Sequence, residues 1–101
     1  MDRTAELVSF FKALGDETRL RLVMLLSQQE PGAAMCVSRL AWELDTTVSN
    51  VSQHLRVLKE LGLLRRERRH HRIHYFLDGE RLADYVAMIR ELLGDQFVVR
   101  R

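Results

Sequence analysis

TTVSNVSQHLRVLKELGLLRRERRHHRIHYFL, residues 46–77, is the stretch that decides the fold. Its first half places apolar residues at positions 48, 51, 55 and 58, a spacing that puts them on one face of a helix. Thr47 can cap the start of that helix, and Gly62 can end it. The second half predicts two strands, Leu63–Glu67 and Arg72–Leu77, because apolar and polar residues alternate in the second of them. The stretch therefore predicts an amphipathic helix followed by a short β-hairpin.

The side of the predicted helix opposite its apolar stripe carries small or hydrogen-bonding side chains and no carboxylate. These side chains belong to Thr47, Ser49, Asn50, Ser52, Gln53 and Arg56. Amide side chains match the edge of adenine, arginine matches guanine, and hydroxyl groups bind bases or phosphates. We expect this face to enter a groove of duplex DNA. The alternative is an ordinary polar surface helix, although such helices more often mix Glu and Lys. His54 lies nearly in line with the stripe and is expected to pack between helices.

The predicted hairpin concentrates positive charge. Residues 46–77 carry seven basic and two acidic side chains, a balance of +5, whereas residues 1–45 carry five and seven, a balance of −2. A positive centre beside negative ends favours a local contact with a polyanion over general adhesion. A solvated charged hairpin is the alternative. Five arginines flank the turn and are candidates for contacts with phosphates or the minor groove: Arg65, Arg66, Arg68, Arg69 and Arg72.

Four more helices are expected around this stretch. One spans Glu6–Leu14, a second begins after an N-cap at Asp16, a third spans about Val37–Leu44, and the last spans Glu80–Leu93. The tail Asp95–Arg101 is expected to be frayed. The fold class is therefore mainly α with one β-hairpin, in a single domain over residues 1–101.

Composition and length restrict the cellular setting. No apolar run approaches the roughly 20 residues that span a bilayer, and Lys12 interrupts the short apolar patch near the N-terminus, so we expect neither a membrane segment nor a signal peptide. The single cysteine, Cys36, excludes an internal disulfide framework and suits a reducing compartment. A cytoplasmic protein is predicted.

Residues 14–77 resemble a known family. The segments LGDETRLRLVMLL (14–26), CVSRLAWEL (36–44), SNVSQHLRVLKELGLLRRERR (49–69) and HYFL (74–77) are similar to those of the ArsR/SmtB, or arsenic-repressor, family of winged helix-turn-helix repressors. The resemblance implies an α-α-α-α-β-β-α domain with a DNA-binding core at about 16–77. It also implies a homodimer built on the first and last helices, about 4–14 and 79–93, which represses transcription from an inverted-repeat operator in double-stranded DNA.

Two turns depart from the family pattern. Asp45 stands in the loop before the reading helix where the family often has glycine, and Asp tolerates a left-handed backbone better than most residues. The hairpin turn Arg68–His71 lacks the usual glycine, so we expect a wider and more mobile turn.

The effector site of such repressors is not complete in this sequence. A thiolate site needs several sulfurs, but Cys36-Val37-Ser38 offers one, and Asp84-Tyr85-Val86 lacks the histidine of the last-helix site. Three possibilities stay open. Cys36 is either a redox-sensing thiol near a helix start or an inert buried cysteine. Alternatively, zinc or nickel binds histidines of the hairpin, His70, His71 and His74, or no small effector acts at all.

The competing functional classes are an enzyme and a protein-interaction module. The sequence has no glycine-rich phosphate loop, no nucleophile elbow and no His-Glu-x-x-His motif. We therefore expect no enzyme. A dimeric module that had lost DNA binding would be expected to carry acidic residues on the reading face, and none is there.

Overall fold

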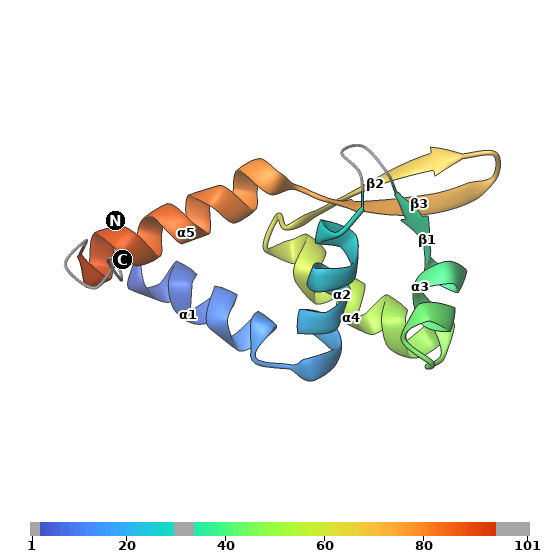
Figure 1. Cartoon of the computed structure of the whole chain (residues 1–101), viewed down its shortest axis with the longest axis horizontal. Helices are drawn as coiled ribbons and strands as arrows, with labels where there is room; N and C mark the ends of the chain where they lie inside the picture. The colour runs from blue at the N-terminus through green and yellow to red at the C-terminus, as the bar shows by residue number, and fades with distance from the viewer. Residues whose placement is uncertain (1–2, 30–33, 95–101) are drawn as a thin grey trace.

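The computed structural model describes residues 3–29 and 34–94 of the chain, and its element order matches the predicted class (Figure 1). The predicted tail Asp95–Arg101 lies outside the described residues. The helices and strands are α1 (Thr4–Leu14), α2 (Glu17–Ser27), β1 (Met35–Cys36), α3 (Val37–Glu43), α4 (Val48–Glu60), β2 (Leu64–Arg69), β3 (Arg72–Leu77) and α5 (Gly79–Leu93). The mainly helical fold with a β-hairpin is confirmed, and only the two-residue strand β1 was not predicted.

The three strands form one antiparallel sheet in the order β1-β3-β2. Leu64 faces Leu77 and Arg69 faces Arg72, so the first hairpin strand runs two residues further than predicted. On the other side of β3, Met35 pairs with Tyr75 and Cys36 with His74. Because β1 leads directly into α3, this pairing ties the hairpin to the helix-turn-helix.

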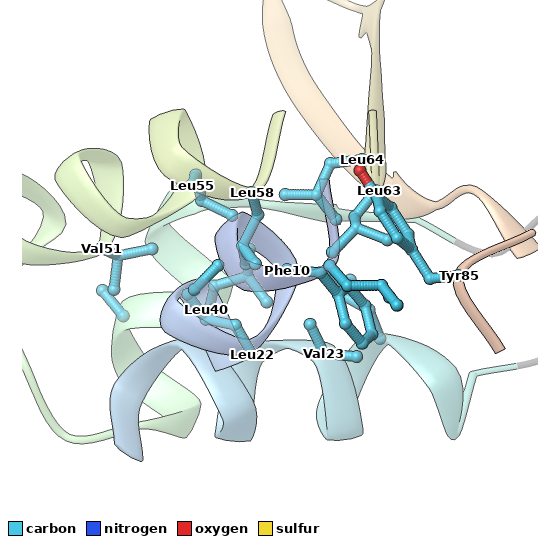
Figure 2. Packing of buried hydrophobic residues seen from close by; sticks show 14 of the residues in the cluster. Phe10, Leu22, Val23, Leu40, Val51, Leu55, Leu58, Leu63, Leu64 and Tyr85 are labelled. Carbon is cyan, nitrogen blue, oxygen red and sulfur yellow. The ribbon is translucent and has the colours of Figure 1, made fainter. Parts of the chain in front are cut away.

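The core lies where α4 packs against the helices that precede it. Val51, Leu55 and Leu58 of α4 are at most 1% exposed, as the predicted stripe requires, whereas its fourth member, Val48 in the first turn of the helix, is 44% exposed and the prediction was wrong there. Figure 2 shows the three buried residues in one cluster with Leu22 of α2 and Leu40 of α3, both fully buried. Thr47 accepts a hydrogen bond from the backbone N–H of Asn50 at 3.0 Å, which confirms it as the N-cap of α4.

A second set of contacts joins the C-terminal end of α4 to α1 and α5. The buried ring of Tyr85 stacks on Phe10 at 4.4 Å, and its hydroxyl donates to the carbonyl of Leu61 at 3.1 Å. The Nε of Arg81 donates to the same carbonyl at 3.2 Å, and its guanidinium lies over the Tyr85 ring. A carbonyl at a helix end has no partner within its helix, so these bonds satisfy it and fix the helix in place.

Arg19 connects the end of α1 to α4. Its Nε donates to the carbonyl of Ala13 at 2.6 Å, and another of its nitrogens lies 3.1 Å from His54 Nδ1. Asp16, the predicted N-cap of α2, accepts from the Arg19 amide and lies 3.7 Å from the same histidine nitrogen. His54 therefore packs between helices, as expected from its place beside the stripe.

Both turns that lack glycine adopt left-handed backbone conformations. Asp45 has a φ of 53°, in agreement with the tolerance of aspartate for this region. The expectation of a wide hairpin turn was wrong. His70 and His71 have φ values of 49° and 69° and alone separate the two strands, as in a type I′ turn. This turn matches the twist of the strands, so the hairpin stays tight even though neither residue is glycine.

The cap of α5 yields a test of the fold. Asp78 accepts from the Arg81 amide at 3.0 Å and from Arg65 Nε at 2.8 Å. These two bonds, the backbone one first, hold the pKa of the Asp78 carboxyl below its usual value. Asp78→Ala should cost about 1 kcal/mol of unfolding free energy at neutral pH, whereas Asp78→Asn keeps an acceptor and should cost less.

The pH dependence follows from the lowered pKa. The charged form stabilises the fold above the pKa of an unfolded aspartate, about 3.9, and this contribution is lost as the pH falls through the lower folded pKa. The difference in unfolding free energy between the parent and Asp78→Asn should therefore shrink below about pH 4. Urea titrations across pH at one protein concentration measure it, and a difference that stays constant would contradict the assigned cause.

Candidate nucleic-acid interface

The polar face of α4 points away from the core. Thr47, Ser49, Ser52, Gln53 and Arg56 are all exposed, which is a consequence of the buried stripe on the opposite side. Asn50 differs from these five, because it is half-buried and its Nδ2 donates to Thr46 Oγ1 at 3.1 Å. The face thus offers five exposed polar side chains, of which Thr47 also caps the helix, and one amide that already serves the turn before the helix.

The register of β2 and β3 divides the hairpin arginines between two faces of the sheet. Arg66 is opposite Tyr75, and Arg68 is opposite Ile73. Opposed residues of an antiparallel pair project to the same face, and β-strand side chains alternate between faces. Arg66 and Arg68 therefore share the face of Leu64, which is buried in the core beneath α4. The sequence alone could not separate these two arginines from the others.

The other hairpin arginines lie on the opposite face and have partners of their own. Arg65 bonds to Asp78 at 2.8 Å, and Arg69 bonds to Glu67 at 3.1 Å. Arg72 is opposite Arg69 and lies beside Cys36. Among the ion pairs of residues 3–29 and 34–94, none involves Arg66 or Arg68. Arg66 and Arg68, on the α4 side, thus have no acidic partner among residues 3–29 and 34–94 and can meet an external anion.

A polar hollow lies between α4 and the sheet. It is a cavity of about 250 Å³ lined by Ser52, Leu55, Arg56, Lys59, Arg66 and Tyr75. Ser52, Arg56 and Arg66 were predicted as DNA contacts from the sequence, whereas Lys59 and Tyr75 were not. The missed signal was the strand alternation, which puts Tyr75 on the same face as Arg66.

Cys36 and His74 are neighbours across the sheet. Both side chains are half-buried, and His74 Nδ1 is a buried nitrogen without a hydrogen-bond partner in the described part of the chain. The Arg39 backbone N–H has the largest effect and lowers the pKa of the Cys36 thiol; burial opposes it, and the Arg72 guanidinium lowers the pKa further. The pair was not predicted, because β1 is too short to be recognised in the sequence.

The residues do not fit the metal sites that the family resemblance raises. His70 and His71 form the hairpin tip, whereas His74 lies inside β3 next to one sulfur only. On α5, Val86 stands where the Asp-x-His pattern that begins at Asp84 needs a ligand histidine. Residues 3–29 and 34–94 contain no group of three or more His, Cys, Asp or Glu side chains that could hold a metal ion.

Helices α1 and α5 leave apolar side chains in solvent. Phe11 is 53% exposed, and Val8, Val86, Leu92 and Leu93 are between 41% and 57% exposed. Figure 1 shows these two helices side by side at the end of the molecule away from α3. No helix among the described residues is long and apolar enough to cross a membrane.

Comparison with known proteins gives a consistent family. The model for bacterial regulatory proteins of the arsR family matches residues 16–66. The arsenical resistance operon repressor of Escherichia coli is 40% identical over 70 residues, which cover 69% of this chain and 57% of the relative. The chain thus spans little more than half the length of that protein. Relatives found in this way are named as regulators and repressors, not enzymes.

Solved structures agree with the sequence match. An ArsR-like transcriptional regulator from Rhodococcus sp. RHA1 has a TM-score of 0.76 at 30% identity, covering 87% of this chain and 79% of that one. A homodimeric winged helix-turn-helix DNA-binding domain from Mycobacterium bovis has a TM-score of 0.69 at 27% identity, covering 92% and 86%. The chain therefore belongs to the arsR family of bacterial regulatory proteins and has their winged helix-turn-helix fold.

Proposed function

We propose that the chain is a cytoplasmic transcriptional repressor that binds an inverted-repeat operator in double-stranded DNA as a homodimer. One observation carries the proposal: a helix face free of carboxylates lies exposed beside a hairpin whose helix-facing arginines have no acidic partner in the part of the chain that the structure describes. Backbone phosphates require such unpaired cations, and base edges require uncharged or cationic hydrogen-bonding groups. The relative from E. coli, named an operon repressor, supports the same reading.

The side chains have different roles in this proposal. Gln53 and Ser49 lie on the exposed face of α4 and would reach base edges in the major groove. Thr47 and Ser52 would bind phosphates or bases, while Arg68 near the hairpin tip would contact the backbone or the minor groove. The Asn50 amide would stay bonded to Thr46 in the turn before α4, so it would contact DNA only with the groups that this bond leaves free.

The reading role of Gln53 is tested by comparing it with Asn50. Gln53→Ala should weaken binding to the chain's own upstream region by about 1–3 kcal/mol, with an unchanged melting temperature, because the side chain is exposed and makes no internal bond among those described. Asn50→Ala should weaken binding and also lower the melting temperature, since it removes the Thr46 contact. Electrophoretic shifts and thermal unfolding measure the two effects. Full affinity in Gln53→Ala would show that another element reads the sequence.

The homodimer would be built on α1 and α5. A chain of 101 residues has a small core, and the exposed apolar residues of these helices offer a surface that a second copy can cover. The M. bovis neighbour, described as homodimeric, supports this arrangement. Two-fold symmetry would place the two α4 helices about one turn of DNA apart, roughly 34 Å.

A charge placed on α5 tests the dimer. Val86 is 41% exposed, so Val86→Glu should leave the monomer folded but raise the dimer dissociation constant at least tenfold, because it would bury a charge in the interface. Trp42→Ala is the control, since Trp42 is 76% exposed on α3, far from α5. Sedimentation at several concentrations measures both. A parent chain that stays monomeric at working concentrations would contradict the proposed assembly.

A thiol switch is the effector mechanism that a specific observation favours. Cys36 has a lowered pKa and lies between α3 and β3, so an added group there would act on the helix-turn-helix and the hairpin together. The thiolate would attack one oxygen of hydrogen peroxide. An S–O bond forms, the O–O bond breaks, hydroxide leaves and takes up a proton, and the sulfur becomes a sulfenic acid. The unpartnered Nδ1 of His74 can hydrogen-bond the new oxygen.

The switch is tested with peroxide on the DNA-bound protein. The parent should release DNA and form a sulfenic acid that a dimedone label captures, while Cys36→Ser should stay bound. Arg72→Gln should slow labelling, because Arg72 helps to lower the thiol pKa. Release by Cys36→Ser under peroxide would exclude the thiol. A parallel panel with zinc and nickel tests the histidine alternative in the same assay.

A further inference from the structure

We propose that the hollow between α4 and the sheet is a phosphate-binding site. Three cationic side chains, Arg56, Lys59 and Arg66, line it, together with the hydroxyl-bearing side chains of Ser52 and Tyr75. Arginine binds phosphate through paired N–H groups, lysine through a point charge, and hydroxyls donate one further hydrogen bond each. This set of donors matches a tetrahedral oxyanion, and its three positive charges repel a cation.

The charges of the hollow are not neutralised within the described part of the chain. No ion pair there involves Arg56, Lys59 or Arg66. The two glutamates of the same elements face elsewhere: Glu60 lines a separate hollow with Lys12 and Arg19, and Glu67 bonds to Arg69 on the far face of the sheet. Three cations around about 250 Å³ repel one another. A bound anion would remove that repulsion.

Packing holds the two walls of the hollow in a fixed relation. Leu55, 1% exposed, forms the floor from α4, and Tyr75 belongs to the strand that pairs with both β1 and β2. Arg66 is opposite Tyr75 in the register, so the guanidinium and the phenol start from adjacent positions on one face. The donors are thus carried by two rigid elements and not by a loop, which lowers the entropic cost of binding.

The position of the hollow indicates which molecule carries the phosphate group that binds there. Arg56 and Lys59 lie one and two turns beyond Ser52 on α4, toward the C-terminal end of the helix from Gln53. If the N-terminal half of α4 enters the major groove, as proposed above, the hollow lies at the edge of the groove, where the DNA backbone passes. This part of the inference depends on the proposed function. A free phosphate or phosphate monoester has the same chemistry and would bind in the hollow even if the proposed function were wrong.

The DNA arm of the test uses a duplex of arbitrary sequence, because backbone contacts do not depend on base identity. Lys59→Gln and Tyr75→Phe should each weaken binding several-fold, and Lys59→Gln should reduce the slope of log affinity against log salt by about 0.9. Arg69→Gln is the charge-matched control, since it also removes one positive charge but lies on the far face of the sheet, where Arg69 already pairs with Glu67. Its effect on affinity and slope should be clearly smaller. Melting temperatures check that each variant is folded.

The second arm titrates inorganic phosphate into the DNA-free protein and follows the side-chain N–H resonances of its arginines and the backbone amides of α4 and β3. Saturable shifts confined to the hollow, and lost in Lys59→Gln, would assign a site that also accepts free phosphate. If Lys59→Gln weakens DNA binding but inorganic phosphate causes no such shifts, the hollow binds phosphates of the DNA backbone and not free phosphate. If the parent binds no duplex, the proposed function fails and the titration alone decides the site. The inference would be overturned if Lys59→Gln and Arg69→Gln weakened DNA binding equally and inorganic phosphate caused no shifts in the resonances of the hollow.

Discussion

Burial of one stripe on α4 is the constraint on which the rest of the structure depends. Val51, Leu55 and Leu58 are removed almost completely from solvent, which at about 25 cal/mol per Å² of apolar surface is a large share of the stability of a small domain. The same burial determines which side chains of α4 point outward. A rotation of the helix by one position would bring polar groups into the core, so the orientation of Ser49 and Gln53 follows from hydrophobic packing.

Polar contacts then hold the ends of this helix against its surroundings. At one end Thr47 caps α4, and at the other end Leu61 receives hydrogen bonds from Arg81 and Tyr85 of α5. Arg19 adds a link from α1 through His54. Of the helices that would form the dimer, α5 is thus bonded directly to the end of α4, and α1 is linked to α4 through Arg19 of α2. A change in the dimer contacts would therefore act on the position of α4 through these hydrogen bonds and not through a flexible loop.

The sequence predicted the elements with strong periodicity and missed the features that depend on pairing between distant residues. The α4 stripe from Val51 to Leu58, the Thr47 cap and the Asp16 cap follow from local patterns, and each is present, although Val48 at the start of the stripe is exposed. The two-residue strand β1 has no pattern of its own, so the Cys36–His74 pair could not be foreseen. The histidine turn was misjudged because sterics alone disfavour left-handed histidines, whereas the twist of the paired strands favours that conformation. Likewise, only the strand register distinguishes Arg66 and Arg68 from Arg65 and Arg69.

The exposure of Trp42 has an optical consequence. It is the single tryptophan of the chain, it is 76% exposed, and its carbonyl accepts from Asp45 in the turn that leads to α4. Indole emission shifts to the blue when water around the ring is displaced. The tryptophan fluorescence of the unlabelled protein therefore originates from one place next to the helix-turn-helix, and its emission wavelength reports whether the indole ring is exposed to water or covered.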